Sequence, residues 1–79
     1  MWWLFVKAAE TANQIIYRYS TESQDLDGEI VFDKITEEWG ISRRSARDRD
    51  SNWCCMKAEE KFWRVVEEGF PERRKVVIG

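Results

Sequence analysis

The chain has 79 residues, a formal net charge of −2, no His, 43% hydrophobic residues and 35% charged residues. These values exclude an intrinsically disordered chain and predict one domain over residues 1–79. The small net charge excludes a global field that would attract nucleic acid or anionic lipid. Without His, acid–base catalysis at neutral pH would require a carboxylate or a Lys with a shifted pKa.

The N-terminal half of the sequence predicts four strands. Residues 2–7 and Ile15–Tyr19 are rich in aromatic and β-branched residues, and Glu29–Asp33 has the same character. A short fourth strand is expected near Trp39–Ile41. The polar residues 21–27 predict a loop that leads into the third strand through an Asp-Gly turn signal.

The first two strands have a helical alternative over residues 4–19. Six residues of this segment also follow a helical stripe: Phe5, Ala8, Ala9, Ala12, Ile16 and Tyr19. We prefer strands because the second half of the segment is strongly β-forming.

The last third of the sequence predicts a helix. Residues 42–50 contain one apolar residue among nine, which indicates an exposed loop. Asp50 or Ser51 is expected to cap a helix that runs from about Asn52 to Glu68. One face of this helix is apolar and consists of Cys54, Cys55, Ala58, Phe62, Val65 and Val66.

The helix is expected to end at Gly69, which supplies a left-handed cap, and Pro71 prevents its continuation. Val76–Ile78 then predicts a short final strand. The fold class is therefore α+β: a small, antiparallel-rich sheet of four to five strands, packed against one helix in the C-terminal half.

Two segments, LDGEIVFDK (Leu26–Lys34) and KFWRVVEEGFPERR (Lys61–Arg74), resemble a group of short, uncharacterised bacterial proteins of about this length. The resemblance covers the whole chain and is tightest at these two segments. It implies an α+β unit whose third and fourth strands form a hairpin, and it implies no functional residues. At Glu37 the chain departs from the Gly that such a hairpin favours.

The two cysteines, Cys54 and Cys55, are adjacent. Neighbours on a helix point about 100° apart, so a disulfide between them is not expected. We interpret both cysteines as small apolar core residues of a protein in a reducing compartment. The apolar start, MWWLFV, is too short for a membrane span and lacks the basic residues of a signal peptide. We therefore expect a cytoplasmic protein.

Ile35–Arg47 resembles the middle of a helix-turn-helix, with a turn at Gly40. In that arrangement three side chains would reach phosphates or guanine edges: Arg43, Arg44 and Arg47. The pattern is broken where small or apolar residues are required, at Thr36, Ala46 and Arg49. DNA binding is thus the alternative function, and we expect no nucleic acid partner.

The acidic residues between Ser23 and Lys34 predict neither a metal site nor catalysis. A calcium loop would need Asp at the first of these positions and Glu at the last. Glu29 and Asp33 lie about 13 Å apart by strand rise, which exceeds the separation that glycosidases use. No phosphate loop, nucleophile elbow or metal triad is present. We predict a non-enzyme with no cofactor, no metal and no catalytic residues.

A sheet covered by one helix leaves its other face open. We predict that aromatic side chains lie on that open face, namely Trp2, Trp3, Tyr17, Tyr19 and Phe32. Exposed aromatic residues mark interfaces. The expected function is a non-enzymatic binding or structural module with a protein partner or a second copy of itself, which would pair through this face.

Overall fold

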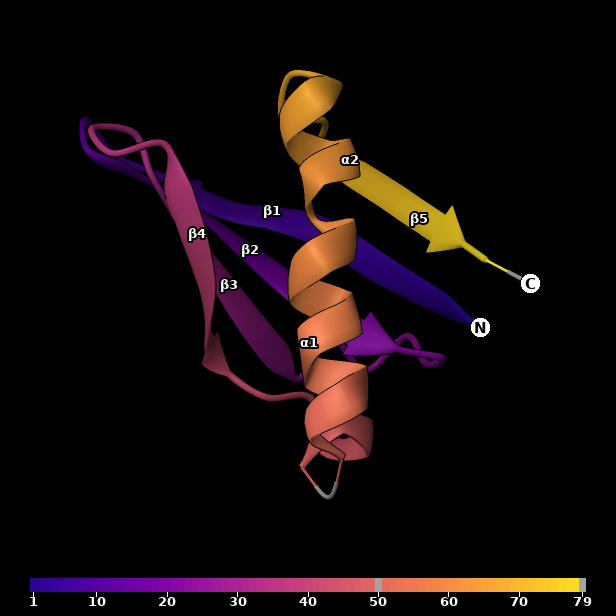
Figure 1. Cartoon of the computed structure of the whole chain (residues 1–79). Coiled ribbons are helices and arrows are strands. Elements are labelled where there is room, and N and C mark those ends of the chain that lie inside the picture. Colours follow the sequence, from indigo (N-terminus) through magenta and orange to yellow (C-terminus); the bar gives the residue numbers. More distant parts are fainter. Residues whose placement is uncertain (50, 79) are drawn as a thin grey trace.

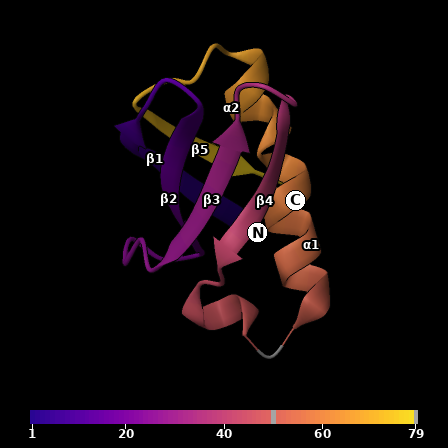
Figure 2. The same ribbon diagram turned by 90° about the vertical axis from the view of Figure 1, so that its left-hand side faces the viewer.

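The computed structural model describes residues 1–49 and 51–78. Five strands form one antiparallel sheet in the order β4-β3-β2-β1-β5, and a helix lies across one face of it (Figures 1 and 2). The elements in chain order are β1 (Trp2–Glu10), β2 (Gln14–Thr21), β3 (Gly28–Asp33), β4 (Glu38–Arg43), the 3₁₀-helix η1 (Ala46–Asp48), α1 (Asn52–Lys61), α2 (Trp63–Glu67) and β5 (Arg73–Val77). The predicted α+β class is confirmed, and the helical alternative for residues 4–19 is wrong.

Side chains alternate between the two faces along each strand. In the register of the sheet, Tyr17 lies opposite Ile30, and Arg18 lies opposite Val6 and Glu29. We call the face under the helix the covered face. It contributes most of the core, which consists of Trp3, Phe5, Ile15, Tyr17, Tyr19, Ile30, Phe32 and Val76, together with Ala58, Phe62 and Val65 from the helix.

The predicted helix over residues 52–68 is present, with an irregularity at Phe62 that separates α1 from α2. Ser51 caps its start, because the Ser51 side chain accepts a 3.2 Å hydrogen bond from the backbone N–H of Cys54. Asp50, the other predicted cap, lies outside the described residues. Gly69 has φ of +79°, as the left-handed cap requires.

The connection between β3 and β4 is a tight turn at residues 34–37. Glu37 occupies the left-handed region, with φ of +60°, and its N–H donates to the carbonyl of Asp33 at 2.8 Å. The side chain of Asp33 accepts two further bonds, from the N–H groups of Ile35 and Thr36. The Asp33 carboxylate and this backbone hydrogen bond thus stabilise the turn, although Gly would adopt the left-handed conformation of Glu37 at a lower conformational free energy.

In the described residues, 1–49 and 51–78, no helix is long and apolar enough to cross a membrane.

Candidate functional site

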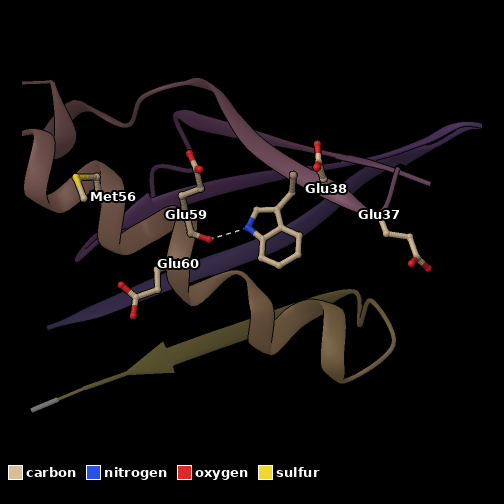
Figure 3. Close-up of a pocket in the computed structure, with 6 residues that line it drawn as sticks. Glu37, Glu38, Met56, Glu59 and Glu60 are labelled. Atoms are coloured by element: carbon tan, nitrogen blue, oxygen red, sulfur yellow. Dashed lines mark hydrogen bonds between the residues drawn. The ribbon is translucent and has the colours of Figure 1, made fainter. Parts of the chain in front are cut away.

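A groove of about 570 Å³ lies between β4 and α1 (Figure 3). We call it the acidic groove, because four of its six lining residues are Glu: the set is Glu37, Glu38, Trp39, Met56, Glu59 and Glu60. The first three come from the turn and the start of β4, and the others come from one side of α1.

Trp39 joins the two walls of the groove. Its Nε1–H donates a 2.8 Å hydrogen bond to the backbone carbonyl of Glu59, drawn as a dashed line in Figure 3. Its ring stacks on Phe32 at 6.2 Å between centroids and contacts Phe62 at 5.8 Å. These contacts hold the Trp39 ring in a single position. Met56, by contrast, is 67% exposed at the mouth of the groove.

The groove has an excess of negative charge. Glu60 forms ion pairs with Lys57 at 3.3 Å and Lys61 at 3.8 Å. Within the part of the chain that the structure describes, the carboxylates of Glu37, Glu38 and Glu59 have no ion-pair partner.

The groove borders an open edge of the sheet. β4 is the last strand in the sheet order, so its outer backbone groups have no strand partner among residues 1–49 and 51–78. On this strand, a Cβ added to Gly40 would meet nothing within 4 Å. An edge of this kind can pair with an extended chain.

Of the predicted interface aromatics, only Trp2 lies on the open face. Trp3, Tyr17 and Tyr19 are fully buried, and Phe32 is 5% exposed. The prediction that these four lie on an open surface is wrong, because they pack under the helix. The Trp2 ring lies 4.4 Å from Nζ of Lys75.

Among the described residues, the strands place no aromatic side chain other than Trp2 on the open face. Its apolar residues, assigned by register, are Leu4, Val6, Ile16, Val31 and Val77. Leu4 is buried, and so is Ser20 opposite it, whose hydroxyl donates to the carbonyl of Ser23. Arg18 and Glu29 lie next to each other across the middle of this face. Polar groups therefore interrupt the apolar residues.

The arginine segment does not form a helix-turn-helix. Residues 34–37 form a turn, Arg43 ends β4, and Arg47 lies in η1. Nε of Arg43 donates to the carbonyl of Asp27 at 3.0 Å, and Arg47 pairs with Glu22 at 3.4 Å. The arrangement that would place Arg43, Arg44 and Arg47 on one recognition helix is therefore absent from these residues.

We expected an exposed loop over residues 42–50; its described part, residues 42–49, is only partly exposed, because Ser45 and Asp48 are buried. The carboxylate of Asp48 accepts hydrogen bonds from the hydroxyls of Tyr19, at 2.6 Å, and Thr21, at 2.8 Å. The N–H of Ser45 donates to the Tyr19 hydroxyl at 3.2 Å. Burial, and next the hydrogen bond to Asp48, raise the pKa of Tyr19.

The two cysteines are free thiols, and both are half-buried. Burial raises the pKa of Cys55, and the nearby Arg44 offsets part of that effect. A raised pKa lowers the thiolate fraction and with it the reactivity of the sulfur. Across the described part of the chain, no group of three or more His, Cys, Asp or Glu side chains is arranged to hold a metal ion.

Comparisons with protein-family models, with curated proteins and with solved structures give no match to this chain.

Proposed function

We propose that this chain is a non-enzymatic binding module that holds an extended, basic segment of a partner protein along β4. The observation that carries the proposal is the position of the acidic groove directly beside the open edge of β4. A segment that adds to a sheet edge gains affinity from main-chain hydrogen bonds and specificity from alternate side chains.

The charges of the groove favour a basic occupant. Alternate side chains of an added strand point to the same side of the sheet. Lys or Arg at every second position would therefore point towards Glu59 on the side of the helix, while the residues between them would lie on the open face, beside Glu38. Carboxylates without an ion-pair partner make this complementarity stronger and exclude acidic segments.

The groove also has a specific apolar contact for such a segment. Met56 is exposed at its mouth, and Ile35, in the adjoining turn, is 75% exposed. An unbranched Met side chain adapts to different neighbours, which suits a surface that binds more than one sequence.

The test is an NMR titration of the full chain with a decapeptide of alternating Lys and Val. We expect shifts of the β4 amides and of Trp39 Nε1–H, and an affinity that falls as salt is added. A peptide of alternating Glu and Val is expected not to bind. Random duplex DNA is expected to show negligible binding at physiological salt.

Two controls separate strand addition from simple charge attraction. The Lys-Val peptide with every backbone nitrogen methylated keeps its charge but has no N–H group to donate to β4 from either edge, and it should bind much more weakly. Glu37→Gln with Glu38→Gln should weaken binding, while the matched Glu67→Gln with Glu72→Gln, both exposed outside the groove, should not. Equal binding of the methylated peptide, or no shift along β4, would overturn the proposal.

A further inference from the structure

The sheet has a second open edge, at β5, on the side opposite β4 (Figure 1). β5 is the last strand on that side, so its outer backbone groups have no strand partner in the described residues. This edge is basic, because Arg73 and Lys75 are exposed on it, and Arg73 has no ion-pair partner within the described part of the chain. Glu37 and Glu38 border the other edge. The two edges of one chain therefore carry opposite charges.

The two edge strands run in the same direction. β1 is antiparallel to β2 and to β5, and the antiparallel pairs continue from β2 through β3 to β4, so β4 and β5 are both antiparallel to β1. A second copy in the same orientation would place its β5 beside β4 as a parallel pair. The helices of both copies would then lie on the same face of one continuous sheet.

We propose that the extended basic segment held along β4 is β5 of a second copy of this chain, so that copies add head to tail. This inference rests on the proposed function, because it requires β4 to accept an added strand, and it names the strand. In one register, Glu38 lies beside the partner's Arg73 on the open face. The same register places Ile41 beside the partner's Val76 on the covered face. Opposite charges and apolar side chains are therefore matched together.

The outer backbone groups of β5 come from alternate residues. Met1 and Ile78 exchange backbone hydrogen bonds at 2.8 Å each. Hydrogen-bonded pairs alternate along an antiparallel ladder, so the N–H and C=O groups of Lys75 and Val77 point away from β1. The Lys75 carbonyl accepts a bond from the Arg74 side chain and keeps a second lone pair.

Along β4 the outer backbone groups belong to Trp39 and Ile41. The N–H of Lys34 donates to the carbonyl of Asn13 at 2.8 Å, which extends the ladder between β2 and β3 by one pair. By the same alternation, Trp39 and Ile41 lie opposite residues of β3 that bond to β2, so their own groups point outward. In a parallel pair, Ile41 would bond to the residues on either side of the partner's Val76. Those residues are the ones whose groups point outward from β5.

Pairing of unlike edges is favoured over pairing of like edges. Two β4 edges would bring two acidic grooves together, and two β5 edges would bring Arg73 and Lys75 of both copies together. A head-to-tail contact uses two different surfaces, so each pair of copies keeps one unpaired β5 and one unpaired β4. Association therefore continues beyond two copies. A single strand pair buries little surface, so each contact should be weak and reversible.

The test is sedimentation of the full chain from micromolar to millimolar concentration, together with amide NMR spectra. We expect the average mass to rise past that of a dimer without a plateau, and amide shifts to change with concentration on both β4 and β5. Glu38→Lys should raise the dissociation constant roughly tenfold or more, because it places a Lys beside the partner's Arg73. Asp25→Lys is the matched control, since it makes the same charge change at an exposed position between β2 and β3, and it should leave the constant unchanged.

A charge exchange tests the register of the contact. Arg73→Glu should weaken association as Glu38→Lys does, and the double variant should restore the wild-type dissociation constant within about threefold. Amide spectra establish that each variant remains folded. A plateau at the mass of a dimer, shifts at one edge only, or no recovery in the double variant would overturn the proposal.

A strict monomer at millimolar concentration would also overturn it. If the Lys-Val peptide nevertheless binds along β4, this inference fails alone and the proposed function stands. If the peptide does not bind either, both fail.

Discussion

The two faces of this sheet come from the same strands but differ in what they carry. The covered face holds the large aromatic residues, and Phe62 packs edge-on against Phe5 at 5.6 Å and Tyr17 at 5.3 Å. The open face holds aliphatic residues interrupted by Arg18 and Glu29. Large rings fill the wide space between a sheet and a single helix. A high aromatic content therefore does not require a second apolar surface.

The two faces also differ in how their ends are closed. At one end of the covered face, η1 packs against β2, and Asp48 accepts hydrogen bonds from the hydroxyls of Tyr19 and Thr21. At the other end, Phe70 packs on Phe32 at 4.8 Å, and the Tyr17 hydroxyl donates to the carbonyl of Pro71 at 2.5 Å. The open face has no corresponding closure by a described helix. The following changes test how far stability depends on the covered face.

The largest effect is expected from Phe62→Ala. Phe62 is fully buried at the centre of the covered face, so its removal should cost about 3–5 kcal/mol of unfolding free energy. Chemical denaturation measures this loss. Trp63→Ala, at a neighbouring and 39% exposed position, is the control and should cost much less. Similar midpoints for the two variants would contradict the placement of the core.

The second effect concerns Asp48. Asp48→Ala leaves the buried hydroxyls of Tyr19 and Thr21 without their acceptor, which should cost about 2–4 kcal/mol. Tyr19→Phe removes one of these hydroxyls, so the double variant should lose less than the sum of the two single losses. Full additivity in denaturation would show that the hydrogen bond contributes nothing.

The sequence predicts the fold well because each element has a strong local signal. Period-2 alternation, the 3.6-residue stripe and the Gly69 cap depend only on neighbouring residues. Asp48 has no such signal. It lies in a run of Arg and Asp that is typical of a solvated loop, and only its contact with β2, 27 and 29 residues earlier, makes it a buried acceptor.

The candidate sites depend on three-dimensional contacts in the same way. The acidic groove needs Trp39 to reach the carbonyl of Glu59, which no residue spacing predicts. Which face of β1 holds Trp3 depends on its pairing with Thr21 and Val76. A shift of one residue would exchange the faces of Trp2 and Trp3, and both assignments fit the composition.

The third effect compares two glycines on the two faces. Gly28 lies on the covered face, where an added Cβ would overlap Cε1 of Tyr19 and lie 2.7 Å from Cδ1 and Cζ of the same ring. Because the Tyr19 hydroxyl is fixed by Asp48, the ring has little room to move, and Gly28→Ala should cost about 1–3 kcal/mol.

Gly40→Ala is the matched control, since nothing lies within 4 Å of its added Cβ. It should leave stability unchanged or raise it slightly, because Ala restricts the unfolded chain more than Gly does. Thermal or chemical unfolding of both variants measures the difference. A loss at Gly40 as large as that at Gly28 would mean that the open face of the sheet is covered at β4.

The smallest effect is expected outside both faces, at the exposed pair of Lys34 and Glu10. Nζ of Lys34 lies 2.7 Å from Oε2 of Glu10 and also donates to the carbonyl of Thr11. The hydrogen bond from Lys34 and its charge lower the pKa of Glu10 below 4.5, and Lys7 adds to this shift. The folded state therefore stabilises the ionised form of Glu10 relative to its protonated form.

The sign of the pH dependence follows from that direction. A carboxyl group whose pKa is lower in the folded state stabilises the fold at pH above its unfolded pKa, and this contribution is lost as the pH falls through the folded pKa. Lys34→Met should raise the pKa of Glu10 and reduce this acid-dependent loss, while Lys34→Arg should preserve the pKa shift and the loss.

A carboxyl ¹³C titration of Glu10 measures the pKa shift directly, and added salt should diminish the shift because the pair is exposed. An unchanged Glu10 pKa in Lys34→Met would mean that the contact is not populated in solution, and that the β3–β4 turn is not tied to the end of β1 by this pair.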